Sequence, residues 1–92
     1  MVEKTMIVRN ETGLHLRPAT ELSNLCLKMD SEIKLIHNGK TINPKSVLLL
    51  MGAGIKQGSE ITIQCKGPNE AEDLSQIVEM INGGFGEKML DL

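Results

Sequence analysis

The segment Glu32–Asn43, EIKLIHNGKTIN, is the most informative stretch of this 92-residue chain. In its first half, Glu32–His37, apolar residues alternate with charged or polar ones, which predicts a strand with one buried face. Asn38-Gly39 follows, and because both residue types tolerate positive φ, the pair predicts a two-residue hairpin turn. The chain then returns as a second strand over Lys40–Asn43, so the whole segment predicts a β-hairpin.

Two further strands are expected on either side of the hairpin. Val2–Val8 precedes it and Glu60–Lys66 follows it, and both segments alternate apolar with polar residues. Strands with one apolar face favour an antiparallel sheet that is covered on one side only. His37 stands directly before the hairpin turn, where we expect an exposed side chain.

Two helices are predicted to cover that sheet. One begins near His15 and runs to about Met29, and the other begins at Asn69 and ends before Gly83. Asn69 and Glu72 have the spacing of a capping box at the start of the second helix. The apolar stripes are Ala19, Leu22, Leu25, Cys26 and Met29 in the first helix, and Ala71, Leu74, Ile77, Val78 and Ile81 in the second.

The apolar run Val47–Met51 allows two interpretations. Ser46 before it is a good N-cap, which favours one or two helical turns, and a short buried strand is the alternative. With the helix, the element order is βαββαβα, an α+β fold in which a layer of helices covers an antiparallel sheet. A chain of this length has enough apolar material for one core, so we expect a single domain over residues 1–92.

Composition excludes several classes of function. Phe85 is the only aromatic residue and the formal net charge is −2, so neither base stacking nor a basic footprint favours nucleic acid as a partner. The longest apolar run has five residues and the N-terminus does not resemble a signal peptide, so we expect a cytoplasmic protein without membrane insertion. Cys26 and Cys65 lack the spacing of a metal or redox pair and are expected in the core.

The segment Gly13–Thr20, GLHLRPAT, combines the residues that chemistry would need. It places His15 at the first turn of a predicted helix, where backbone N–H groups without intrahelical partners and the helix dipole favour an anion. Pro18 fits this first turn because its missing N–H has no acceptor there. A neutral imidazole can accept a phosphoryl group, and the guanidinium of Arg17 can bind phosphoryl oxygens in pairs.

The sequence contains neither a P-loop nor a cluster of carboxylates spaced for a metal. We therefore expect a phosphoryl carrier that is not itself an enzyme, with no cofactor and no metal. Taken alone, His15 and Arg17 also fit the ordinary surface of a helix terminus.

A family resemblance distinguishes these alternatives. Gly13–Ala19 resembles the active-site signature of HPr, the histidine-containing phosphocarrier of the phosphoenolpyruvate-dependent sugar phosphotransferase system. Asn43–Ser46, the turn Gly54–Gly58 and the strand start Gly58–Ile63 resemble the same family, in the same order and spacing. The resemblance implies an open-faced β-sandwich, in which three helices cover one face of a four-stranded antiparallel sheet.

The resemblance also implies the chemistry and the partners. Enzyme I would phosphorylate Nδ1 of His15, Arg17 would stabilise the phosphoryl group, and IIA domains of sugar permeases would accept it. Ser46 matches a regulatory serine that HPr kinase/phosphorylase modifies, after which catabolite control protein A binds. Two alternatives stay open: an HPr-like protein of a nitrogen-linked phosphotransferase branch, and a regulatory paralogue that acts mainly through Ser46.

Some positions differ from the usual family pattern. Leu16, Pro44 and Leu49 replace residue types that are more common there, which leaves partner preference open. Glu87–Leu92 extends slightly beyond the usual end of the family, and the sequence assigns it no function.

The apolar residues that the predicted core does not need suggest a docking patch. At about 100° per residue, three side chains of the first helix fall on the flank of its core stripe, and Val47–Met51 cannot bury five consecutive apolar residues on one side. Exposed apolar groups beside an active site mark a partner surface, although Leu27 and Leu48 could instead complete the core. We predict a monomer with one patch around His15 and Arg17, formed by Leu16, Thr20, Leu27, Val47, Leu48 and Met51.

Overall fold

The predicted hairpin is present in the computed structural model, which describes residues 1–91. Strand β2 (Glu32–His37) pairs with β3 (Lys40–Ile42) in antiparallel register, with Leu35 opposite Ile42. Asn38 and Gly39 have φ of 51° and 78°, and two positive φ angles in succession are what a type I′ turn requires. β3 ends one residue early because the Asn43 side chain turns back to accept a hydrogen bond from the backbone N–H of Lys45, at 3.0 Å.

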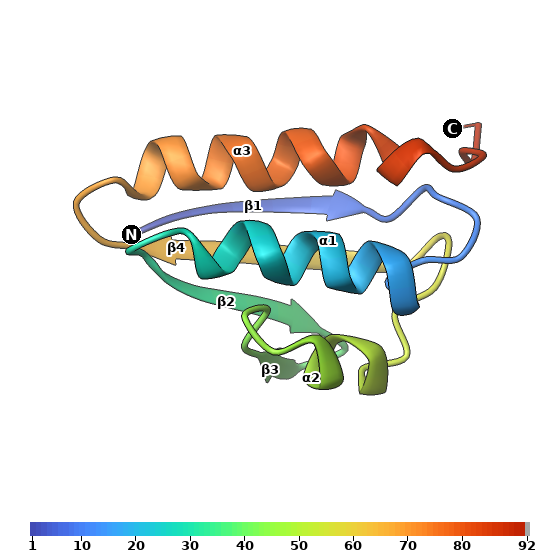
Figure 1. Cartoon of the computed structure of the whole chain (residues 1–92), viewed down its shortest axis with the longest axis horizontal. Coiled ribbons are helices and arrows are strands. Elements are labelled where there is room, and N and C mark those ends of the chain that lie inside the picture. The colour runs from blue at the N-terminus through green and yellow to red at the C-terminus, as the bar shows by residue number, and fades with distance from the viewer. Residues whose placement is uncertain (92) are drawn as a thin grey trace.

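All four predicted strands form one antiparallel sheet (Figure 1). β4 (Glu60–Lys66) lies between β2 and β1 (Val2–Ile7), and the strand order is β1-β4-β2-β3. Val8 lies just outside β1, yet its N–H still donates to the carbonyl of Ser59 at 2.8 Å. The first strand of the chain is therefore an edge strand, and β4 is central.

Three helices lie against the sheet, and α1 (Leu16–Leu27) contacts both α2 (Val47–Gly52) and α3 (Glu70–Asn82) (Figure 1). A 3-10 turn, η1 (Gly84–Gly86), follows α3. This arrangement confirms the predicted α+β class with the order βαββαβα. Within the part of the chain that the structure describes, no helix is long and apolar enough to cross a membrane.

The core between sheet and helices is mainly aliphatic, and Phe85 is the one aromatic residue that contributes to it. Cys26 and Cys65 are fully buried in it, and this burial raises the pKa of Cys26 to about 12 and that of Cys65 to about 11. The interpretation of both as core residues is confirmed. His37 was expected to be exposed, and this prediction is wrong: only 7% of it is accessible, because it follows Ile33 and Leu35 at alternate positions on the covered face of β2.

The ends of the helices agree with the sequence in one case and differ in another. Ser46 caps α2, and its hydroxyl accepts the N–H of Leu49 at 3.2 Å, which excludes the alternative of a buried strand. The capping box of α3 is absent, since the Asn69 side chain caps no N–H of the described residues. The first turn of α3 is held instead by Asp73, which accepts the buried hydroxyl of Ser31 at 2.5 Å.

Candidate functional site

His15 occupies the N-cap of α1, with φ of −81° and ψ of −161°, and is exposed. Its carbonyl accepts the first bond of the helix, from the N–H of Ala19 at 2.8 Å, but within residues 1–91 its side chain makes no capping hydrogen bond. Leu16 and Arg17 provide the N–H groups of the first helical positions, which have no intrahelical acceptor. An exposed imidazole thus stands beside the positive end of a helix dipole.

A glycine fixes the loop that delivers His15 to this position. Gly13 has φ of +63°, and a Cβ there would lie 2.4 Å from the carbonyl oxygen of Ile55. The next residue, Leu14, is buried, and its N–H donates to the same carbonyl at 3.1 Å. This close approach has no room for a side chain, so the glycine of the signature is needed to place the start of α1.

Arg17 is exposed and engaged by two carboxylates. Its guanidinium lies 3.3 Å from Glu21, one helical turn further along α1, and 3.1 Å from Glu87, which follows η1. The sequence predicted the position of Arg17 on the first turn but neither of these partners. In this structure the guanidinium is therefore already paired, and a phosphoryl group would compete with the two carboxylates for it.

Glu87 is the residue of the site that the sequence missed. Its carboxylate accepts hydrogen bonds from the Thr12 N–H at 3.0 Å, from the Thr12 hydroxyl at 2.8 Å and from the Asn10 amide at 3.1 Å. These donors lower the pKa of Glu87 to about 2, the Thr12 N–H first and then the Thr12 and Asn10 side chains, while the charge of Arg17 contributes least. No local pattern could have indicated contacts with residues 70 or more positions earlier.

This hydrogen-bonding pattern predicts a pH dependence of stability. Because the pKa of Glu87 is about 2 in the folded state and 4.5 otherwise, its contribution is complete above pH 4.5 and disappears as the pH falls to about 2. We expect the wild type to be more stable than Glu87→Gln at pH 6 and the difference in melting temperature to vanish near pH 2. Thr12→Val, which removes one donor, should move this loss to higher pH. A difference in melting temperature between wild type and Glu87→Gln that stays constant from pH 6 to pH 2 would contradict the prediction.

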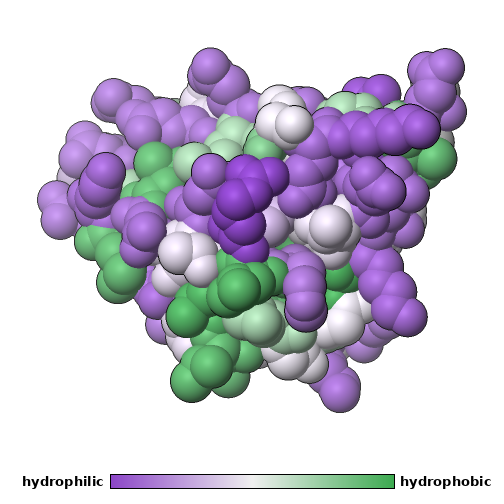
Figure 2. Space-filling view, turned by 45° about the vertical axis from the view of Figure 1, so that its right-hand side comes forward, coloured by the Kyte–Doolittle hydropathy of each residue, from purple (hydrophilic) through white to green (hydrophobic). Residues whose placement is uncertain are grey.

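The residues of the predicted docking patch differ in exposure. Leu16 and Leu27 on α1 are each 60% exposed and Leu48 on α2 is 78% exposed, so the alternative that Leu27 and Leu48 complete the core is wrong. Thr20 is exposed, and Val47 and Met51 are half-buried against the core. On the face that Figure 2 draws, apolar side chains gather in the lower part, at the height where Figure 1 draws α2. Leu49, 53% exposed, adds an apolar residue that the predicted patch did not include.

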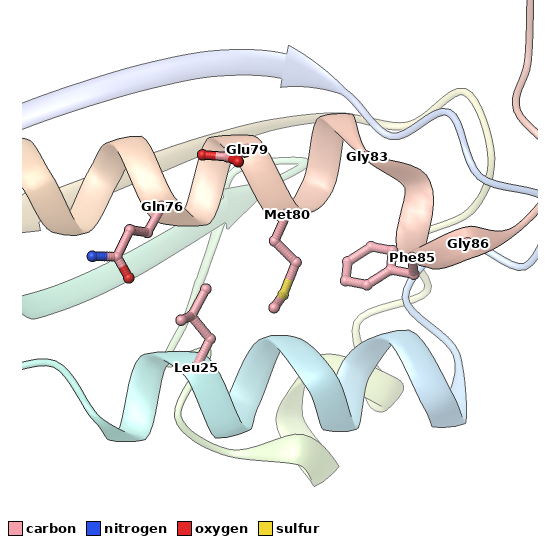
Figure 3. A pocket seen from close by; sticks show the side chains of 7 residues that line it. All are labelled: Leu25, Gln76, Glu79, Met80, Gly83, Phe85 and Gly86. Atoms are coloured by element: carbon pink, nitrogen blue, oxygen red, sulfur yellow. The ribbon is translucent and has the colours of Figure 1, made fainter.

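A groove of about 450 Å³ lies between α1 and α3, away from His15 (Figure 3). Leu25, Met80 and the ring of Phe85 give it an apolar floor. Phe85 is only 8% exposed, and it anchors the η1 turn from which the chain continues to Glu87. The groove matters to the site because the buried Phe85, two residues before Glu87, fixes the position from which the chain reaches Arg17.

Comparison with known proteins agrees with this geometry. Residues 2–83 match the family model described as the PTS HPr component phosphorylation site. Among solved structures, HPr from Thermoanaerobacter tengcongensis is 34% identical with a TM-score of 0.91, over 96% of this chain and 99% of that one. The histidine-containing phosphocarrier protein from Mycoplasma is also 34% identical, with a TM-score of 0.84, over 89% of this chain and 93% of that one.

A third similar structure is Crh, a catabolite repression protein from Bacillus subtilis, which is 31% identical with a TM-score of 0.72. The match covers 91% of this chain and 97% of Crh. The crystal structure of Crh is described as an intertwined, swapped dimer. The family match spans nearly the whole described chain, and both HPr and Crh share its sheet and helices. The chain belongs to the HPr family, the phosphocarrier proteins of the phosphotransferase system.

Proposed function

We propose that this chain accepts a phosphoryl group from enzyme I on Nδ1 of His15 and donates it to IIA domains of sugar permeases. The observation that carries the proposal is an exposed imidazole at the N-cap of α1, free of any capping bond within residues 1–91. When the chain accepts the group, a bond forms between Nδ1 and phosphorus as the bond from phosphorus to enzyme I breaks. When the chain donates it, the bond between Nδ1 and phosphorus breaks as phosphorus bonds to the IIA domain. The N–H groups of Leu16 and Arg17 and the Arg17 guanidinium stabilise the charge on the phosphoryl oxygens.

The direct test is a phosphorylation assay read by mass. The chain is incubated with phosphoenolpyruvate, Mg²⁺ and a bacterial enzyme I, and is weighed before and after mild acid. A phosphate on histidine is lost in acid, whereas a phosphate on serine remains. We expect one acid-labile phosphate per chain, and the absence of any acid-labile phosphate would refute the proposal.

Regulation through Ser46 is a second part of the proposal, which the similarity to Crh supports. Ser46 caps α2 and is half-buried, beside Leu48 of the docking patch. HPr kinase/phosphorylase would modify it, and catabolite control protein A would bind the product.

A protein that acted mainly through Ser46 would not need His15, so the intact histidine favours the carrier over the regulatory paralogue. A nitrogen-linked branch would share the His15 chemistry, and transfer assays with IIA domains of both branches distinguish the two.

Phosphorylation of Ser46 is expected to stabilise α2 and to weaken docking to enzyme I. The phosphate adds about 1.5 to 2 negative charges at a helix N-terminus, where the dipole favours them, but it also places an anion at the edge of an apolar surface. The measurement compares enzyme I affinity and amide exchange in α2 between unmodified and phosphorylated protein. Equal affinity of the two forms would contradict the docking half of this prediction.

The docking patch is expected to be a surface for enzyme I and the IIA domains in turn. Leu48→Asp and Leu16→Glu should weaken enzyme I binding on the order of tenfold, as the loss of a central apolar contact does. Both should keep near-native melting temperatures, because these side chains are mostly exposed. Leu50→Ala is the matched control on α2: Leu50 is fully buried, so this variant should lose about 2–5 kcal/mol of stability but keep its affinity.

A low melting temperature with normal enzyme I binding in Leu48→Asp would contradict the docking patch.

We further propose that the chain works in the cytoplasm as a monomer. Light scattering of the purified chain tests the oligomeric state, since a related HPr from Thermoanaerobacter tengcongensis and Crh are both described as dimers.

A further inference from the structure

The C-terminal segment folds back along the loop that precedes His15. The N–H of Glu11 donates to the carbonyl of Lys88 at 2.9 Å, and the N–H of Leu90 donates to the carbonyl of Arg9 at 2.5 Å. Asn10 and Met89 lie opposite each other in this antiparallel bridge. The segment Glu87–Leu90, here called the tail strap, is thus attached by backbone hydrogen bonds on both sides of Asn10.

Two side-chain contacts add to this attachment. Met89 packs directly on Gly84, where the φ of +69° favours glycine and a Cβ would lie 1.9 Å from the methionine sulfur. The Nε–H of Arg9 donates to the carbonyl of Leu90 at 3.1 Å. Just before the strap, the buried ring of Phe85 lines the α1–α3 groove (Figure 3) and fixes the point at which the strap begins.

The strap determines where the Glu87 carboxylate lies. Glu87 is bound by Thr12 and Asn10 as well as by Arg17, and its side chain is only 14% exposed. Its donors on the loop remain when the guanidinium leaves, so Glu87 does not need Arg17 to stay in place. The side chain of Arg17, in contrast, contacts only carboxylates within residues 1–91, namely those of Glu87 and the exposed Glu21.

We propose that the tail strap is an autoinhibitory contact. Backbone pairing of Lys88–Leu90 with the loop at Asn10 holds the Glu87 carboxylate in place. The carboxylate in turn keeps the Arg17 guanidinium paired until the phosphoryl group takes the place of the carboxylate. The proposal rests on the proposed function, because it concerns the availability of Arg17 for the phosphoryl oxygens. Both the carboxylate of Glu87 and a phosphoryl group are anions, and a guanidinium that is shared by two carboxylates binds a third anion less tightly. Releasing the strap therefore makes Arg17 more available.

The test uses a backbone substitution far from His15. Leu90→Pro removes the N–H that donates to Arg9, whereas Leu90→Ala keeps it and serves as the matched control. The resonance of the Arg17 side-chain Nε–H reports the ion pair, and titration with inorganic phosphate reports the affinity of the site. We expect Leu90→Pro to shift the Arg17 resonance and to raise phosphate affinity about two- to fivefold, while Leu90→Ala behaves as the wild type.

Two further variants keep the test independent of folding and of the proposed function. Glu87→Gln removes the charge without altering the backbone and should shift Arg17 in the same direction, while Glu21→Gln, which does not touch the strap, should leave the Glu87 side-chain signal unchanged. If Leu90→Pro unfolds, Glu87→Gln decides. Equal Arg17 resonances and equal phosphate affinities in wild type and Glu87→Gln would overturn the strap. Failure of enzyme I to phosphorylate His15 in the wild type would refute the proposed function. The Arg17 resonance and the phosphate affinity would still test the strap, because neither measurement uses enzyme I.

Discussion

His15→Ala is expected to abolish acceptance of the phosphoryl group and to leave the fold intact. The imidazole is the proposed nucleophile, and the only other histidine, His37, is buried on β2 with 7% accessibility. Loss of the side chain removes no core contact and no capping bond of the described residues, because His15 is exposed and caps no N–H with its ring. We therefore expect an unchanged melting temperature together with complete loss of acid-labile phosphate after incubation with enzyme I and phosphoenolpyruvate.

His37→Gln is the control for this variant. It removes the second imidazole from a covered position, so it should lower the melting temperature but retain the acid-labile phosphate. Acid-labile phosphate on His15→Ala would contradict the assignment of the nucleophile. Loss of phosphate from His37→Gln in a protein that is still folded would contradict it as well, since His37 would then take part in the transfer.

The strands were predictable because their patterns are local. β2 and β4 match the predicted bounds, since alternation over six or seven residues records directly which face is covered. The hairpin turn was equally clear, because Asn38 and Gly39 are the residue types that its two positive φ angles require. His37 shows where a local rule was misapplied: its place before a turn suggested exposure, but alternation along β2 puts it on the same face as Leu35.

The candidate site was predictable only in part, and sequence separation explains the difference. His15 and Arg17 lie two residues apart on one helix start, so a motif contains them both. Glu87 reaches the same place through the buried Phe85 and through tail pairing with the loop at Asn10, which are contacts between opposite ends of the chain. A single sequence has no periodicity that records such contacts, and the last residues therefore carried no assigned function.

Arg17→Ala is expected to slow phosphoryl transfer about a hundredfold while His15 remains a competent acceptor. One well-placed charged donor has an effect on the order of 10² in comparable electrostatic sites, because it acts where charge develops in the transition state. The fold should not suffer, since the guanidinium is 54% exposed and its ion pairs with Glu21 and Glu87 lie at the surface. The measurement is the rate of transfer from enzyme I to the chain, under conditions in which kcat and KM are determined separately.

The pattern among related variants identifies the cause of that loss. If Arg17 acts in the transition state, kcat falls more than KM rises, and Arg17→Lys recovers only part of the rate because an ammonium lacks the paired donors of a guanidinium. Lys28→Ala removes an exposed cation from the other end of α1 and should leave both constants unchanged. If Arg17→Ala and Lys28→Ala both raised KM and left kcat unchanged, the positive charge on α1 would serve only to attract the partner. An unchanged rate in Arg17→Ala would remove Arg17 from the transfer altogether, and the N–H groups at the start of α1 would then be the stabilising donors that remain.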